Sequence, residues 1–308
     1  MPDAILILGA GGFIGRSLTQ TLAKRGVPVI AVSHSGGDTS HALIETVAGD
    51  FREPEQFEPL LRRSRAVVHL ATTSTPGTSA ARPLQEIETN LHFTAALLQA
   101  LHRHPQVGLL YMSSGGSLYA DTTTEPSSES ARLQPRSYHG AAKLAAETFI
   151  SAWSHQVGGG ATILRPSNVY GPGQPERQGF GVIPAAFGTL LRGDVMHIWG
   201  DGSARRDYIY IDDLVELCAL ALTSPTTAGV RTFNACSGTS ISLNELLSAI
   251  ESVTGKTLQR TYDQGRAVDA SCIAMDPGLA AQVFGWHHRT SLEAGLRQTW
   301  EQFRRAAK

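Results

Sequence analysis

The sequence has no disulfide pattern, no membrane-length apolar run and no excess of one charge. Its 308 residues include three cysteines, at 218, 236 and 272, a spacing that forms neither a disulfide framework nor a metal-ligand pattern. A reducing, cytoplasmic location is therefore expected, and no metal site is predicted. The 26 basic and 27 acidic residues are interspersed, so neither nucleic acid nor an anionic membrane surface is an expected partner.

The apolar segment near the start, AILILG at residues 4–9, is followed at once by glycines. It is too short for a membrane span and has no basic segment before it, so it is not typical of a signal peptide. A short apolar run that ends in glycine is typical of a buried strand.

Strand and helix patterns alternate along the first half of the chain. The predicted strands are 4–9, 27–33, 66–71 and 108–114, and the predicted helices are 13–26, 54–64 and 84–104. This alternation predicts an α/β fold, a Rossmann-type doubly wound parallel sheet. Loops and shorter elements follow and predict a smaller α/β C-terminal substrate lobe. The expected division is a dinucleotide-binding domain at 1–165 and a nucleotide-sugar lobe at 166–308, with 207–235 returning to the first domain.

The segment GAGGFIG between the first strand and the first helix predicts a phosphate-binding turn. Gly9, Gly12 and Gly15 let the backbone turn tightly and let a pyrophosphate approach the N-terminus of the helix that Phe13 and Ile14 open. The position between a strand and a helix makes the motif specific for a dinucleotide.

The end of the second strand bears on the choice between NAD and NADP. An NAD site usually has an acidic residue there for the ribose hydroxyls. This sequence has Ser33 and His34 instead. NAD is the expected cofactor, and these neutral residues leave NADP open.

At this point the chain resembles the extended short-chain dehydrogenase/reductase family, specifically its NAD(P)-dependent nucleotide-sugar epimerases and dehydratases. The resemblance covers nearly the whole chain. Its motifs include GAGGFIG, VVHLAT at 67–72, YMSSGGSLYAD at 111–121, LRPSNVYGPGQ at 164–174 and WGDGSARRDYIYIDDL at 199–214.

The resemblance implies both cofactor and substrate contacts. The implied cofactor residues, with the glycine turn, are Gly9, Gly12, Phe13, Ile14, Gly15, Ser33, His34, Asp50, Phe51, Leu70, Ala71, Thr72, Asn90, Lys143 and Pro166. The implied substrate residues are Asn168, Val182, Trp199, Arg206 and Arg266. Arginine suits a diphosphate because its guanidinium binds phosphate oxygens in pairs. Arg206 could instead pair with a nearby aspartate, and Trp199 could be a core residue.

The helix that would carry the chemistry departs from the family pattern. Family members use a Ser/Thr, Tyr, Lys set in which the tyrosine and lysine stand four residues apart. Here Lys143 is present, but His139 stands four residues before it and Tyr138 five. On a regular helix His139 lies about 40° from Lys143 and Tyr138 about 140°. Either the imidazole is the acid/base, or the helix begins late and Tyr138 takes that place, or redox catalysis is lost.

A second departure concerns the family's Ser/Thr and its dehydratase acids. The Ser/Thr position falls on Gly115, with Ser114 and Ser117 as alternative hydroxyls. Gly116 and Ser117 stand where 4,6-dehydratases have an Asp-Glu pair, which argues against water elimination because a general acid is missing. The adjacent glycines could also mean that the substrate packs against the backbone here.

The leading hypothesis is an epimerase that inverts C4 of a UDP-linked hexose through a 4-keto intermediate. The alternatives are an NADPH-dependent 4-keto-sugar reductase, a catalytically silent binding protein, and a non-redox epimerase or eliminase with a histidine base. A homodimer is expected by analogy with the family, through the helices on either side of the active-site segment and the segment SLEAGLRQTWEQF at 291–303.

Overall fold

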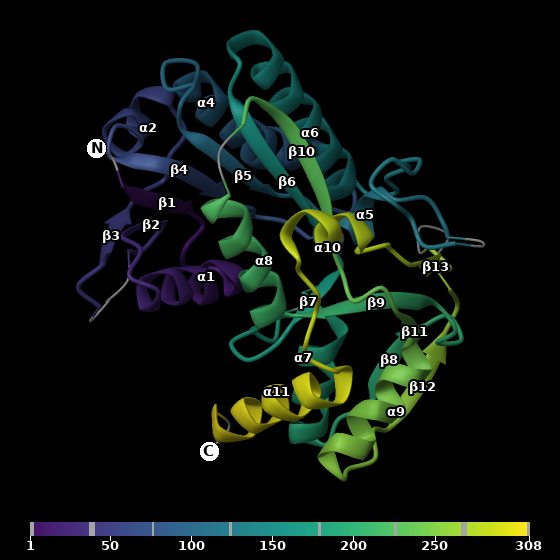
Figure 1. The fold of residues 1–308 in the computed structure, drawn as a ribbon. Coiled ribbons are helices and arrows are strands. Elements are labelled where there is room, and N and C mark those ends of the chain that lie inside the picture. Colours follow the sequence, from purple (N-terminus) through teal and green to yellow (C-terminus); the bar gives the residue numbers. More distant parts are fainter. Residues whose placement is uncertain are drawn as a thin grey trace.

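The computed structural model describes residues 3–36, 41–75, 77–122, 125–177, 180–224, 227–265 and 270–306. Its main sheet has seven strands in the order β10-β6-β5-β4-β1-β2-β3 (Figure 1). All neighbours pair in parallel. The strands are β1 (Ala4–Leu8), β2 (Val29–Ser33), β3 (Ile44–Ala48), β4 (Ser64–His69), β5 (Gly108–Met112), β6 (Gly160–Pro166) and β10 (Gly229–Ala235). The strand order reverses between β1 and β4, which is where such sheets open a crevice at their carboxyl ends.

Two layers of helices cover the sheet, because successive residues of a strand face opposite sides. In β1, Leu6 and Leu8 belong to one hydrophobic core, and Ile5 and Ile7 belong to the other. The first layer consists of α2 (Pro54–Leu61), α4 (His92–Leu101) and α6 (Tyr138–Val157), and the second of α1 (Phe13–Lys24) and α8 (Ile211–Thr223). The predicted Rossmann-type fold is therefore confirmed.

The second core continues into a smaller lobe at the carboxyl edge of the sheet (Figure 1). One small sheet contains β7 (Asn168–Tyr170), β9 (Arg205–Tyr210), β11 (Ser240–Ser242) and β13 (Cys272–Ile273), and a two-stranded sheet contains β8 (Met196–Trp199) and β12 (Arg260–Asp263). The helices of this region are α7 (Val182–Arg192), α9 (Leu243–Thr254) and α11 (Leu292–Ala306), whereas α10 (Gly278–Phe284) packs against β10 and α8. Because β10 pairs with β6, the chain returns to the main sheet before α9. The domain boundaries stay a prediction.

The predicted helix at 84–104 differs in one important respect. It begins as α3 (Pro83–Gln85), passes through a π-helix, η1 (Glu86–Leu91), and continues as α4. A π-helix adds a residue to the turn and often marks a functional site. Among the described residues, no helix has both the length and the apolar character needed to cross a bilayer.

Candidate functional site

A group of the predicted site residues lies at the carboxyl ends of β1, β4, β5 and β6. The glycine turn follows β1, Leu70 follows β4, the serines follow β5, and Pro166 ends β6. In a parallel sheet these ends lie at one edge, so residues distant in sequence come together there. No group of three or more His, Cys, Asp or Glu in the described ranges could hold a metal ion.

The glycine turn requires its glycines for steric reasons. Gly9 has φ +91°, and a Cβ there would lie 2.8 Å from the backbone nitrogen of Ala71. A Cβ on Gly15 would lie 2.2 Å from the carbonyl oxygen of Gly9. Gly12 is exposed and precedes α1 directly, so the first amides of the helix face the crevice edge. This arrangement fits a pyrophosphate at the helix N-terminus.

The residues expected near the adenosine lie at the ends of β2 and β3. The Ser33 hydroxyl donates to the carbonyl of Gly36 at 2.8 Å, and His34 is exposed. Asp50 is exposed and pairs with Arg52 at 2.6 Å, whereas Phe51 is buried. The site therefore offers hydrogen-bonding groups but no carboxylate at the end of β2, as the sequence indicates.

The segment after β4 is tied to the π-helix. Leu70 and Ala71 are half-buried and Thr72 is exposed, so these residues can line the crevice. The next amide, that of Thr73, donates to Oδ1 of Asn90 at 3.0 Å. Asn90 therefore holds the loop after β4 beside the crevice.

Helix α6 distinguishes His139 from Tyr138. The helix begins at Tyr138, and the Ser137 side chain caps it by accepting from the amide of Gly140. His139 is 7% exposed and its Nδ1 lies 3.0 Å from Oγ of Ser74, whereas Tyr138 is 47% exposed. Burial and the Lys143 charge lower the pKa of His139 to about 3, so the imidazole is neutral at physiological pH. His139 rather than Tyr138 thus lies buried one turn before Lys143.

Lys143 is buried beneath the same site. Its Nζ donates to the carbonyl of Met112 at 2.8 Å and lies 4.9 Å from the centre of the Tyr111 ring. Burial lowers the pKa of Lys143 to about 8, although the charges of Glu86 and Glu147 oppose this change. The ammonium is therefore held at the end of β5, next to the expected nicotinamide ribose.

The two glycines after β5 differ in their surroundings. Ser114 precedes the short helix α5 (Gly115–Leu118) and Ser117 lies within it, and their hydroxyls lie 3.0 Å apart. A Cβ on Gly115 would lie 2.1 Å from Sδ of Met275, whereas a Cβ on Gly116 would meet nothing within 4 Å. Met275 therefore covers Gly115, and a close approach by substrate is possible only at Gly116.

Sequence reasoning missed several buried polar residues under the site. Arg165 of β6 binds Glu147 of α6 at 2.6 Å and donates to the hydroxyl of Tyr119 at 3.0 Å. Glu86 and Ser74 join Asn90 in a hydrogen-bonded chain that reaches His139. The spacing of these residues carries no signal, because the fold alone brings them together.

The expected substrate residues lie on the second lobe. Asn168 donates to the carbonyl of Asp207 at 2.9 Å, and Val182 is the first residue of α7. Trp199 ends β8 and is 55% exposed, so it is not the core aromatic that the sequence left open. Arg206 donates to the carbonyl of Arg205 at 2.8 Å, and the Asp207 carboxylate accepts from Ser237 rather than from Arg206. Arg266 lies outside the described residues.

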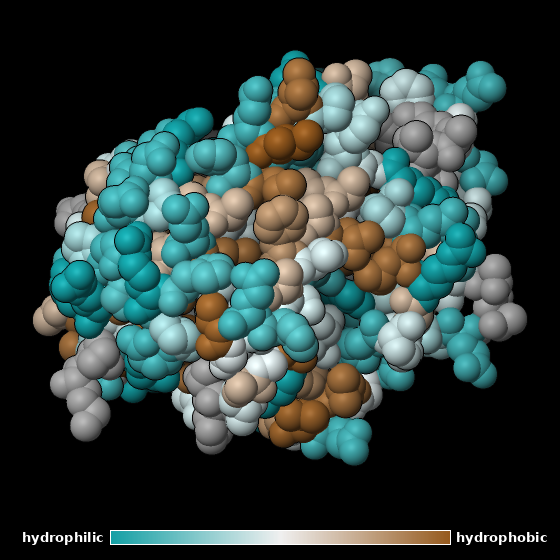
Figure 2. Space-filling model, turned by 90° about the horizontal axis from the view of Figure 1, so that it is seen from above, coloured by the Kyte–Doolittle hydropathy of each residue, from teal (hydrophilic) through white to brown (hydrophobic). Residues whose placement is uncertain are grey.

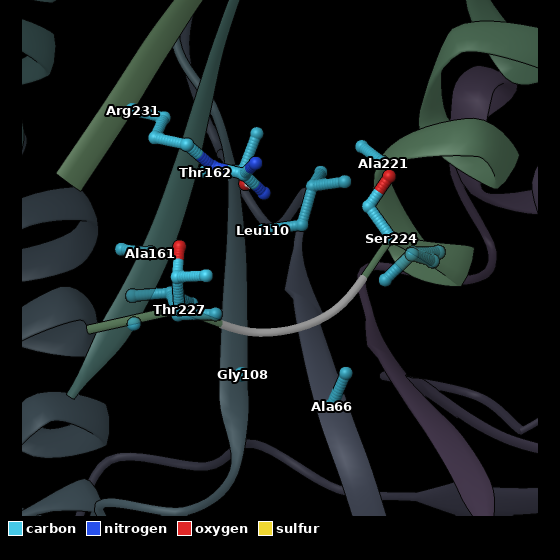
Figure 3. Close-up of a pocket in the computed structure, with 12 residues that line it drawn as sticks. Ala66, Gly108, Leu110, Ala161, Thr162, Ala221, Ser224, Thr227 and Arg231 are labelled. Carbon is cyan, nitrogen blue, oxygen red and sulfur yellow. Dashed lines mark hydrogen bonds between the residues drawn. The ribbon is translucent and has the colours of Figure 1, made fainter. Parts of the chain in front are cut away.

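A separate hollow lies away from this edge and is too small for a nucleotide. Figure 3 shows Gly108 and Ala161, at the amino-terminal parts of β5 and β6, with Ser224 from beyond α8. The volume of this hollow is about 30 Å³, far below the roughly 300–1,000 Å³ of a small-molecule site.

A family model and two relatives match this chain over most of its length. The model of the NAD dependent epimerase/dehydratase family matches residues 5–236. The UDP-glucose 4-epimerase of Mycolicibacterium smegmatis is 28% identical over 97% of this chain and 98% of its own length. The dTDP-4-dehydro-6-deoxyglucose reductase of Escherichia coli is also 28% identical, over 96% of this chain and 95% of its own length.

A solved structure extends the likeness to three dimensions. The crystal structure of UDP-glucose 4-epimerase with UDP-glucose from Thermotoga maritima superimposes with a TM-score of 0.91 and 30% identity. The match covers 99% of this chain and 100% of that one.

Proposed function

This chain belongs to the NAD-dependent epimerase/dehydratase family, and we propose that it is a nucleotide-sugar epimerase that inverts C4 of a UDP-linked hexose. The observation that carries the proposal is His139, buried one turn before Lys143 at the carboxyl edge of the sheet. Oxidation at C4 requires a base that takes the hydroxyl proton and a cation that holds the cofactor. His139 and Lys143 match these two roles.

The site residues fit NAD, the cofactor of the family. Gly9 and Gly15 have no space for a side chain, and the turn leaves the first amides of α1 for the pyrophosphate. Lys143 would hold the nicotinamide ribose. When bound, NAD supplies an acceptor for the C4 hydride and later a donor that returns it.

The chain's own residues would manage the proton. Neutral His139 takes the proton of the C4 hydroxyl as the carbonyl forms, and gives it back when the sugar is reduced on its other face. Ser114 or Ser117 would bind the same oxygen. The glycine at 116 and the serine at 117 supply no general acid, which is the physical reason that water elimination is not proposed.

The second lobe would hold the UDP moiety. We propose that Asn168 and the backbone near Val182 bind the diphosphate and sugar, that Arg206 pairs with phosphate, and that Trp199 stacks on the base. Trp199 is 55% exposed at the end of β8.

Proton NMR of the purified protein with UDP-glucose or UDP-galactose tests this proposal. We expect each sugar to convert to the other without net consumption of dinucleotide. If neither UDP-sugar changes and the protein binds no nicotinamide dinucleotide, the proposal is wrong. Binding of both ligands without any reaction would instead support a silent binding protein, and solvent deuterium next to a carbonyl would support non-redox chemistry.

A second candidate is an NADPH-dependent 4-keto-sugar reductase. The absence of a carboxylate at Ser33 and His34, together with the likeness to a dTDP-sugar reductase, favours it. Stoichiometric oxidation of NADPH by a 4-keto sugar would identify this activity, because an epimerase returns its hydride.

We propose a cytoplasmic homodimer that forms through α4 and α6. The sequence also suggested the segment at 291–303, but Leu296 and Trp300 of α11 are buried within their own chain. A hollow of about 590 Å³ between α4 and α6 is lined by Leu98, Phe149 and Trp153, and Phe149 is 49% exposed. Figure 2 views the molecule from the side of α4 and α6, and shows apolar patches among hydrophilic surroundings.

A further inference from the structure

Glu86 is a buried carboxylate that the proposed chemistry does not yet use. It is 3% exposed, and Oε1 has no hydrogen-bond partner among the described residues. Buried acids are rare unless they are paired, because removing a charge from water is costly. Glu86 is also the first residue of the π-helix η1.

A chain of hydrogen bonds leads from Glu86 to His139. Oε2 of Glu86 accepts from Nδ2 of Asn90 at 2.7 Å, and the same Nδ2 donates to Oγ of Ser74 at 2.9 Å. Oγ of Ser74 lies 3.0 Å from Nδ1 of His139. The amide of Asn90 can point only this way, because its Oδ1 accepts from the backbone amide of Thr73.

Ser74 can serve either protonation state of His139. Asn90 occupies one lone pair of Oγ, so a second lone pair and the hydroxyl hydrogen remain for Nδ1. The hydroxyl donates when Nδ1 is bare and accepts when Nδ1 carries a hydrogen. The ring therefore keeps its orientation while Nε2 gains or loses a proton.

Glu86 differs from the other acid among the charged groups around His139. The ionisable groups that face the site are Lys143 and Glu147 of α6, Arg165 of β6, Tyr111 of β5, His69 of β4 and Glu86 of η1. Glu147 is bound to Arg165, and the Glu86 charge is the larger of the two that raise the pKa of Lys143. A proton on His139 would add a second cation beside Lys143, so the site needs a nearby negative charge.

We propose that Glu86 is the counter-charge of the acid/base site and positions His139 through Asn90 and Ser74. The inference rests on the proposed function, because it concerns the step in which the sugar hydroxyl is oxidised. In that step the O–H bond breaks and an N–H bond forms at Nε2, while Nδ1–H donates to Ser74. The proton returns to the sugar oxygen in the reverse step, so the imidazole ends as it began.

The substitution Glu86→Gln tests the role of the charge with little change in shape. We expect kcat to fall by about tenfold or more while KM for the nucleotide sugar stays within about threefold. Glu88→Gln is the matched control, because Glu88 lies in the same π-helix but is exposed, and it should leave both constants unchanged. Glu86→Asp, which keeps the charge, should recover part of kcat. An unchanged kcat, or a rise in KM alone, would refute the proposal.

A second readout separates this proposal from the proposed function. The reactivity of the Lys143 amine toward a methylating reagent, followed by mass spectrometry across a pH series, reports the pKa of Lys143 without any turnover. Glu86→Gln should lower that pKa from about 8, and Glu88→Gln should not. If the wild-type protein epimerises no UDP-sugar, the proposed function is wrong, yet a lower pKa in Glu86→Gln would still support the counter-charge. An unchanged pKa would overturn it.

Discussion

The proposed chemistry depends on a difference of one residue at the start of α6. Tyr138 and His139 are adjacent, yet their exposed fractions are 47% and 7%. A shift of one residue rotates a side chain by about 100° around the helix, so only one of the two can face Ser74. The Ser137 cap fixes where the helix begins and therefore which residue that is.

Two buried neutral histidines should make the fold sensitive to acid. Burial lowers the pKa of both His69 and His139 from 6.5 to about 3. Below pH 6.5 the unfolded chain binds protons that the folded chain does not, so stability is full above that pH and is lost as the pH falls. We expect a loss of about 1.4 kcal/mol per pH unit for each histidine.

Urea unfolding at about pH 7 and about pH 5.5 measures this loss, and the variant His139→Gln isolates one contribution. Its free energy of unfolding should fall less between the two pH values than that of the wild-type protein. Equal losses in both proteins would contradict the buried, neutral state of His139.

For single residues, the sequence predicted the position of a side chain on its helix better than it predicted the residues that the side chain contacts. The four-residue interval between His139 and Lys143 predicted one shared helix face, because local spacing sets local geometry. Ser74 and Glu86 could not be found in that way. Their contacts depend on a loop and a π-helix far from α6 in sequence.

Among the elements, α5 shows how the second lobe shapes the first. Met275 lies beyond β13, yet its thioether occupies the space over Gly115, the first residue of α5. A larger residue at this position would require Met275, which is fully buried, to repack. The lack of a side chain at Gly115 is therefore a packing requirement between the two lobes.

The substitution Gly115→Ala should destabilise the protein by about 1–3 kcal/mol through this contact. Gly116→Ala is the control, since a Cβ there would meet nothing within 4 Å. Thermal unfolding should show a lower Tm for the first variant only. Adding Met275→Ala should restore part of the loss at Gly115, and a purely additive effect of the two changes would contradict the contact.

The helices and strands also show which kinds of element a sequence pattern fails to predict. The buried strands β1, β4 and β5 were predicted because short, continuous apolar runs are distinctive. The edge strand β3, with the sequence IETVA, was missed because it is half-exposed and carries a charge and a hydroxyl. The π-helix was missed because its one added residue leaves the apolar pattern of a helix nearly unchanged.

In the whole molecule, the sheet and the second lobe place the site between them. The alternation of strands and helices predicted the sheet, since parallel strands need crossover helices. The second lobe was harder to predict, because its strands are short and pair across long stretches of sequence, as β9 does with β11 and β13. Contacts of that kind leave no periodic signal.

The proposed dimer is a property of the whole molecule and can be tested by one surface change. Phe149→Glu places a charge on the apolar face of α4 and α6, which should separate the subunits because a buried unpaired charge is costly. Val283→Glu is the control, since Val283 is similarly exposed on α10. Light scattering after size exclusion should give half the wild-type mass for Phe149→Glu only. An unchanged mass would exclude this face as the interface.

The acid/base residue can be identified from the rate at which UDP-glucose and UDP-galactose interconvert, measured by NMR for wild type, His139→Asn and Tyr138→Phe. If His139 is the acid/base, His139→Asn should lose about a hundredfold or more in kcat while still binding NAD, and Tyr138→Phe should stay within about threefold of wild type. The reverse pattern, in which Tyr138→Phe is inactive and His139→Asn remains active, would contradict the assignment of the acid/base to His139.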